Sequence, residues 1–121
     1  MYEIIIISGN VGKSDGLKYT PDGKAVLGFS VGCSRNVKDE WKTVWYQVSL
    51  WNEAAEHQAE RIVKGKKVLV QGKLNADYTT GGPRLYQRKD GTYGASYEIL
   101  ADVVRVVPES KITDEPAEIP Y

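Results

Sequence analysis

Residues 43–51 show the clearest alternation of apolar and polar positions in the chain. Their even-numbered side chains form one apolar face of a predicted β-strand: Val44, Tyr46, Val48 and Leu50. The opposite face is polar except for Trp45 and Trp51, which stand about 20 Å apart at roughly 3.3 Å per residue. Two large rings on a polar face are unfavourable in water unless something covers them. We therefore expect this face to meet a ligand or another subunit.

Similar patterns predict the other elements. β-Branched or alternating runs predict strands at 2–8, 25–34, 66–74 and 95–107, and residues 86–93 around Asp90-Gly91 predict the tip of a long hairpin arm. Turn signals predict a loop over 13–24 and a polar connection over 35–42.

One helix is predicted over 53–64, with Asn52 as its N-cap and Gly65 as its end. Its apolar positions are Ala55, Ala59, Ile62 and Val63. Three strands, one helix and two strands predict an all-β fold with one helix, arranged as a five-stranded Greek-key barrel of the OB type.

The composition changes at Pro108. The whole chain has 16 basic and 16 acidic residues, but residues 108–121 hold one basic residue and four acidic residues. Residues 1–107 therefore carry a net charge of +3, which the acidic segment cancels. We expect a barrel domain over 1–107 and a disordered acidic tail over 108–121.

Catalytic and metal-binding patterns are missing from the sequence. His57 is the single histidine and Cys33 the single cysteine, so neither a zinc set nor an internal disulfide is expected. No nucleophile can be paired with His57, and residues 9–14 fail the phosphate-loop pattern because Ile7 stands where a glycine is needed. No signal peptide or membrane anchor is seen, which predicts an intracellular, cytoplasmic protein. Because no catalytic or metal-binding cluster is found, we expect no enzyme activity, cofactor or metal.

Basic residues are interleaved with aromatic ones. Tyr19 follows Lys18, Trp41 precedes Lys42, and Tyr86 stands near Arg84, Arg88 and Lys89. Cations that meet phosphates and rings that stack on bases are what sequence-independent binding of single-stranded nucleic acid needs. The alternative at this point is that Trp45 and Trp51 pack at a subunit interface.

The chain resembles the bacterial single-stranded DNA-binding protein family over residues 4–107. The resemblance rests on Gly9-Asn10-Val11-Gly12-Lys13, on residues 17–26, on Thr43 to Trp51 and on Val63 to Leu74. It implies an OB barrel that assembles as a homotetramer, associates with the nucleoid and wraps single-stranded DNA during replication, recombination and repair.

The resemblance also implies site residues. Trp45 aligns with a base-stacking tryptophan, Trp51 with a stacking aromatic and Tyr86 with a stacking tryptophan of the arm, with Tyr78 as its rival because residues 77–83 add length. Another family tryptophan aligns with Val37, where Trp41 could serve instead. Tyr19 is a further stacking candidate. The expected phosphate contacts are Lys13, Lys18, Lys24, Arg35, Lys42, Lys73, Arg84, Arg88 and Lys89.

The end of the chain resembles the family's acidic tip, which docks replication and repair proteins. The matching residues are Asp114, Glu115, Glu118, Ile119, Pro120 and Tyr121. Two alternatives remain: an adaptor of the same fold, related to primosomal proteins, that chiefly binds replication proteins, and an assembly module that uses the tryptophans for oligomerisation.

Overall fold

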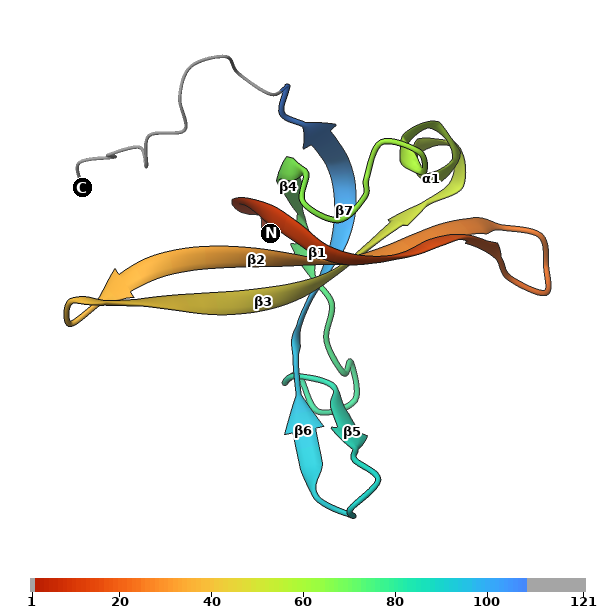
Figure 1. The fold of residues 1–121 in the computed structure, drawn as a ribbon. Coiled ribbons are helices and arrows are strands. Elements are labelled where there is room, and N and C mark those ends of the chain that lie inside the picture. The colour runs from red at the N-terminus through yellow and green to blue at the C-terminus, as the bar shows by residue number, and fades with distance from the viewer. Residues whose placement is uncertain (1, 109–121) are drawn as a thin grey trace.

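Five strands close into a barrel in the computed structural model, which describes residues 2–108. They are β1 (Ile5–Tyr19), β2 (Ala25–Val37), β3 (Glu40–Trp51), β4 (Lys67–Leu74) and β7 (Tyr97–Val106). Their order around the barrel is β1-β2-β3-β7-β4, and β4 pairs with β1 to close it (Figure 1). Every neighbouring pair is antiparallel except β3 and β7, which run parallel. The predicted OB-type barrel is confirmed.

The inward side chains of these strands form one core. Val48 and Leu50 of β3 are buried in it, while Val44 and Tyr46 are half-buried where β3 leaves the barrel. The predicted apolar face of β3 is therefore the inner face. The core consists of Ile7, Val11, Ala25, Leu27, Phe29, Val31, Val48, Leu50, Ala55, Ile62, Val68, Val70, Ile99 and Val104.

Strand β1 is longer than predicted, and the expected loop over 13–24 is wrong for residues 13–19. These residues pair with β2 as far as Tyr19 opposite Ala25, with two register shifts along the way. The Asp15-Gly16 signal marks one of these irregularities, where Gly16 has a φ of 78°. The turn itself is confined to residues 20–24, where Gly23 donates its N–H to the Thr20 carbonyl at 2.8 Å.

The predicted polar connection over 35–42 is also wrong, because β2 and β3 continue as a paired ladder to its end. Val37 stands opposite Glu40. Lys38 and Asp39 form the turn with φ values of 52° and 65°, the left-handed pair that a tight hairpin turn requires. The β2–β3 hairpin and the β1–β2 hairpin extend from the barrel in opposite directions (Figure 1).

Helix α1 (Asn52–Gln58) is shorter than the predicted 53–64, and Asn52 is not its cap. Trp51 occupies the N-cap position without a side-chain hydrogen bond, and Asn52 has a left-handed φ of 60°. Ala55 and Ile62 are buried as expected, whereas Val63 is exposed. Gln58 closes this end of the barrel by donating from Nε2 to the Val104 carbonyl at 3.3 Å.

The hairpin arm is confirmed as a separate two-stranded sheet of β5 (Leu85–Gln87) and β6 (Tyr93–Ala95). It projects from the barrel in a third direction (Figure 1). The predicted strand over 95–107 is thus divided, with Ala95 in the arm and β7 starting at Tyr97. At the tip, Thr92 donates its N–H and hydroxyl to Asp90, which holds the pKa of that carboxyl below its usual value.

Candidate nucleic-acid interface

One outward face of β1, β2 and β3 brings together the three tryptophans and two of the predicted phosphate contacts. Residues directly opposite each other in a sheet point to the same side. In one row across the sheet, Trp51 of β3 lies opposite Val26 of β2, which lies opposite Lys18 of β1. In a second row, Gln47 of β3 lies opposite Ser30 of β2, which lies opposite Lys13 of β1. Trp45 pairs with Gly32, and Trp41 with Asn36. We call the face defined by Trp41, Trp45, Trp51, Lys13 and Lys18 the aromatic face.

The indole of Trp45 lies against two glycines. A Cβ at Gly12 would stand 2.5 and 2.7 Å from its Cζ3 and Cη2 atoms, and a Cβ at Gly32 would stand 2.9 Å from both. The ring therefore rests on the backbone of β1 and β2, while half of its surface stays exposed. This support fixes the ring and leaves it accessible to a flat ligand. Residues 9–12 belong to β1, and Gly12 is part of this support, which we call the Trp45 seat.

Trp51 lies at the end of the aromatic face next to α1, whereas the stacking candidate Tyr19 pairs with Ala25 and points to the other side of the sheet. Trp51 is 38% exposed and Tyr19 is 58% exposed. The Tyr19 hydroxyl donates to Glu56 Oε2 at 2.9 Å, and this hydrogen bond raises the pKa of the tyrosine. Tyr19 thus ties the β1–β2 turn to α1 and leaves its ring exposed.

Trp41 and Val37 lie on opposite sides of the β2–β3 hairpin. Trp41 pairs with Asn36 and is 69% exposed, whereas Val37 is the next residue after Asn36 and points to the other side. Of these two candidates for the third stacking position, only Trp41 shares a face with Trp45.

The predicted phosphate contacts divide between the two sides of the sheet. Lys73 pairs with Leu100, which pairs with Ser49, so Lys73 points to the same side as Trp51. Arg35 and Lys42 pair with each other on the opposite side of the hairpin from Trp41. Exposed carboxylates accompany three cations: Asp15 lies 3.9 Å from Lys13, Asp22 lies 4.0 Å from Lys24 and Glu40 lies 3.1 Å from Lys42. Such exposed pairs are weak and exchange readily for phosphates.

In the arm, as at Trp45, an aromatic ring lies against a glycine. Tyr86 stands opposite Gly94, and a Cβ at Gly94 would lie 2.9 Å from its Cζ atom. Arg88 places its Cζ 5.6 Å from the centre of the Tyr86 ring and donates from Nη1 to the Tyr93 carbonyl at 2.6 Å. One side of Tyr86 is therefore occupied by Arg88, and 48% of the residue remains exposed. Lys89 is exposed beside the tip of the arm.

Tyr78, the alternative to Tyr86, is 78% exposed in the loop that precedes the arm. Its hydroxyl reaches Asn75 Oδ1 at 3.5 Å, a long contact. Asp77 and Gly82 close this loop by a β-bridge. Tyr86 has a firmer support than Tyr78, because a glycine and an arginine hold its ring.

The base of the arm is joined to the barrel by Glu98, which the sequence did not single out. Glu98 Oε1 accepts hydrogen bonds from Arg84 Nη1 at 3.4 Å and from Asn75 Nδ2 at 3.1 Å. Because Gln47 pairs with Glu98, this carboxylate points to the same side as Trp45. The register of β3 against β7 decides which side Glu98 faces, and no sequence motif indicates its contacts with Arg84 and Asn75. Gly12, Gly32 and Gly94 were likewise unrecognised as ring supports.

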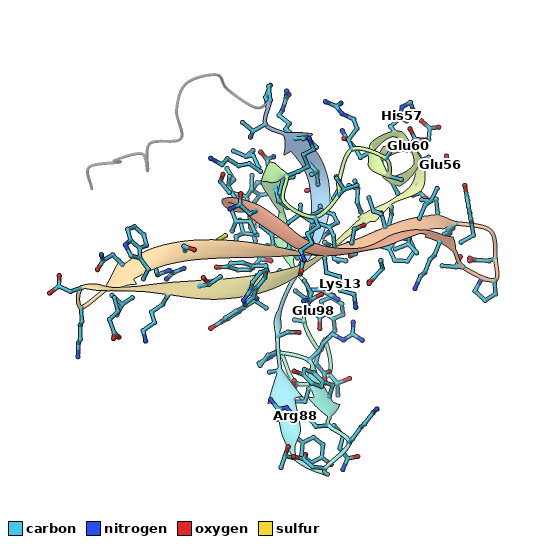
Figure 2. The ribbon with its side chains drawn as sticks, viewed as in Figure 1. Lys13, Glu56, His57, Glu60, Arg88 and Glu98 are labelled. Atoms are coloured by element: carbon cyan, nitrogen blue, oxygen red, sulfur yellow. The ribbon has the colours of Figure 1, made fainter. Side chains whose placement is uncertain are left out.

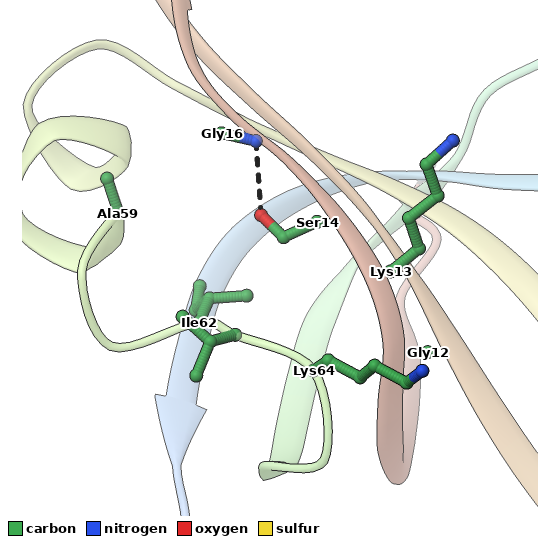
Figure 3. A pocket seen from close by; sticks show the side chains of 8 residues that line it. Gly12, Lys13, Ser14, Gly16, Ala59, Ile62 and Lys64 are labelled. Carbon is green, nitrogen blue, oxygen red and sulfur yellow. Dashed lines mark hydrogen bonds between the residues drawn. The ribbon is translucent and has the colours of Figure 1, made fainter.

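No catalytic arrangement emerges within residues 2–108. Burial raises the pKa of the Cys33 thiol, which is half-buried beside the core, and His57 is exposed on α1. An open cleft of about 610 Å³ between β1 and the segment after α1 holds Lys13, Ser14 and Lys64 but no carboxylate (Figure 3). Its remaining lining residues are Gly12, Gly16, Ala59, Ile62 and Val63. The described residues contain no group of three or more metal-ligating side chains.

The acidic side chains of α1 lie away from the arm. Glu56 and His57 of α1, and Glu60 just after it, lie at one end of the molecule, whereas Arg88 lies on the arm and Lys13 near the barrel between them (Figure 2). A polyanion would therefore meet cations along the aromatic face and the arm, and carboxylates beyond Trp51.

A closed OB-type barrel with exposed rings and cations on one side belongs to the class of nucleic-acid-binding OB domains. Comparison with known proteins agrees. The model of the single-strand binding protein family matches residues 2–107, so the chain belongs to this family. The description of this family is that of binding proteins and not of enzymes.

Named relatives include single-stranded DNA-binding proteins of several bacteria. One from Paenarthrobacter aurescens is 33% identical over 83% of this chain and 58% of its own length. One from Neisseria meningitidis serogroup A is 29% identical over 85% of this chain and 58% of its own. Single-stranded DNA-binding protein 2 of Streptomyces coelicolor is 32% identical over 84% and 51%. The chain thus spans little more than half the length of these curated relatives.

No helix among residues 2–108 is long and apolar enough to cross a membrane. All of the predicted tail except Pro108 lies outside the described residues, and with it the predicted tip: Asp114, Glu115, Glu118, Ile119, Pro120 and Tyr121.

Proposed function

We propose that this protein binds single-stranded DNA without sequence preference and protects it during replication, recombination and repair. The observation that carries the proposal is the gathering of Trp41, Trp45 and Trp51 with Lys13 and Lys18 on one face. Bases stack on the rings, which tolerate any base, while the cations neutralise phosphates. Tyr86 of the arm provides a further ring.

Titration with oligo-dT tests this proposal, with tryptophan fluorescence as the signal. We expect quenching, and an affinity that falls steeply as salt rises because counterions are released from the phosphates. A duplex of the same length serves as the control and binds more weakly. Absence of quenching, or tight binding that salt does not change, would refute the proposal.

We further propose that the chain assembles with copies of itself as a homotetramer, through a surface other than the aromatic face. Ile6, Gln71 and Val103 form one row across the outside of β1, β4 and β7, and Ile6 is 57% exposed. Aliphatic side chains on an outer sheet face favour burial against another subunit. This surface leaves the tryptophans free for DNA.

The assembly-module alternative assigns the tryptophans to the subunit contact instead. The two views separate in a double variant, Trp45→Ala with Trp51→Ala, compared with Ile6→Lys by mass measurement in solution. We expect the tryptophan variant to keep the wild-type mass and lose DNA binding, and Ile6→Lys to lower the mass. Dissociation of the tryptophan variant would favour the alternative.

The acidic tip at residues 114–121 is proposed to recruit replication and repair proteins. Ile119 and Tyr121 provide apolar side chains, and Asp114, Glu115 and Glu118 provide charge for a basic rim. The adaptor alternative, against which such a tail argues, predicts little coating of DNA, so saturation of long oligo-dT distinguishes it.

A further inference from the structure

Glu98 is an acidic residue on the side of the sheet that carries Lys13 and the tryptophans of the aromatic face. Glu98 of β7 lies in one row with Lys13 of β1, Ser30 of β2 and Gln47 of β3. Its side chain is 25% exposed. A carboxylate on a surface that tracks phosphates weakens binding by like-charge repulsion. Direct contact with DNA therefore does not explain why a carboxylate stands at this position.

The contacts of Glu98 supply this reason. Its Oε1 accepts from Arg84, the residue before β5, and from Asn75, the residue after β4. The Asn75 N–H also donates to the Glu98 carbonyl at 2.9 Å. Glu98 therefore joins the chain that enters the arm to the strand that leaves it. The arm is otherwise a sheet of its own, hydrogen-bonded as β5 with β6.

We propose that Glu98 is a positioning residue for DNA binding, which sets the angle of the arm through Arg84 and Asn75 and so holds Tyr86 where it continues the row of stacking rings. Arg84 then acts mainly on Glu98 and not on phosphate, which changes the role expected of it from the sequence. This inference rests on the proposed binding of single-stranded DNA.

The two possible roles of Arg84 predict opposite signs for Glu98→Gln. If Arg84 contacts phosphate, removing the Glu98 charge frees it and binding of oligo-dT tightens. If Glu98 positions the arm, the same substitution weakens binding. A fully stacked base contributes about 5- to 150-fold in affinity, so a displaced Tyr86 ring should cost about 3- to 10-fold.

The experiment measures oligo-dT affinity at several salt concentrations for wild type, Glu98→Gln and Arg84→Gln, each also in a Tyr86→Ala background. Asp102→Asn is the matched control, because Asp102 is an exposed carboxylate of the same strand with no partner among residues 2–108. We expect weaker binding for Glu98→Gln and Arg84→Gln with an unchanged salt slope, no weakening for Asp102→Asn, and no further loss once Tyr86 is removed.

Other outcomes overturn the inference. These are tighter or unchanged binding by Glu98→Gln, a salt slope lowered by about one in Arg84→Gln, or a Glu98 effect that persists in Tyr86→Ala. An unchanged affinity of Tyr86→Ala alone overturns it as well. In each of these cases, binding by the wild type leaves the proposed function standing, whereas failure of the wild type to bind refutes the proposed function itself.

Discussion

The seat of Trp45 leads to a prediction about Gly12, a residue that need not touch DNA. A methyl group at Gly12 would lie 2.5 Å from Cζ3 and 2.7 Å from Cη2 of the indole, about 1 Å inside the normal contact distance of about 3.5–4.0 Å. The indole is rigid, so it must tilt or lift off the sheet. Gly32→Ala makes a milder conflict at 2.9 Å.

The expected loss follows from the stacking energy. Complete loss of one stacked base costs about 1–3 kcal/mol, or about 5- to 150-fold in affinity. We expect Gly12→Ala to lose much of this, Gly32→Ala less, and Trp45→Ala the full amount. The assay is the anisotropy of labelled oligo-dT, which does not depend on Trp45 as the reporter.

Gly28→Ala is the matched control. Gly28 lies on the same strand and side as Gly32, but the nearest atom to an added Cβ is the end of the Asp15 side chain at 3.2 Å, which is free to move. We expect near wild-type binding for Gly28→Ala, and no further loss when Gly12→Ala is added to Trp45→Ala. If Gly12→Ala folds and binds like Gly28→Ala, the seat does not position the ring and the reasoning is refuted.

Three further predictions concern single side chains and the tail. Lys18→Gln should lower the slope of log affinity against log salt by about one without changing base preference; an unchanged slope would exclude Lys18 from the phosphate path. Tyr19→Phe should bind oligo-dT like wild type, because the ring stays, but lose the bond to Glu56. Because that bond raises the pKa of Tyr19, the wild type should be more stable than this variant below about pH 10, and the two stabilities should converge as the pH rises further. Thermal melts at several pH values measure this difference. Equal stability at every pH would contradict a stabilising contact between Tyr19 and Glu56. Removing residues 108–121, which carry a net charge of −3, should tighten DNA binding at low salt and have little effect at high salt, and equal affinities at low salt would count against competition by the tail.

The sequence predicted the barrel because local patterns determine which side of each strand is buried. Alternation in residues 43–51 correctly placed Val48 and Leu50 inside and both tryptophans outside. The strand order with one helix after the third strand matched the observed topology. These properties depend on neighbours along the chain, which the sequence contains.

Turn signals were less reliable because pairing between strands overrides local propensity. Asp15-Gly16 forms an irregularity within β1 and not a loop, since the backbone there still finds partners in β2. Lys38 and Asp39 turn the chain without glycine, so no sequence signal marked the true hairpin turn. Asn52 could not cap α1 because its backbone is left-handed.

The sequence by itself determined the kinds of chemistry in this protein: exposed rings, interleaved cations, a basic body and an acidic end. Only the tertiary structure decided which of them act together. Register between strands placed Trp41 and Lys18 beside the other rings and sent Arg35 and Lys42 to the opposite side. It also brought Glu98 to Arg84 across 14 residues and set Gly12 beneath Trp45. Such contacts depend on pairing between distant segments, which the closure of the barrel imposes and which no local pattern encodes.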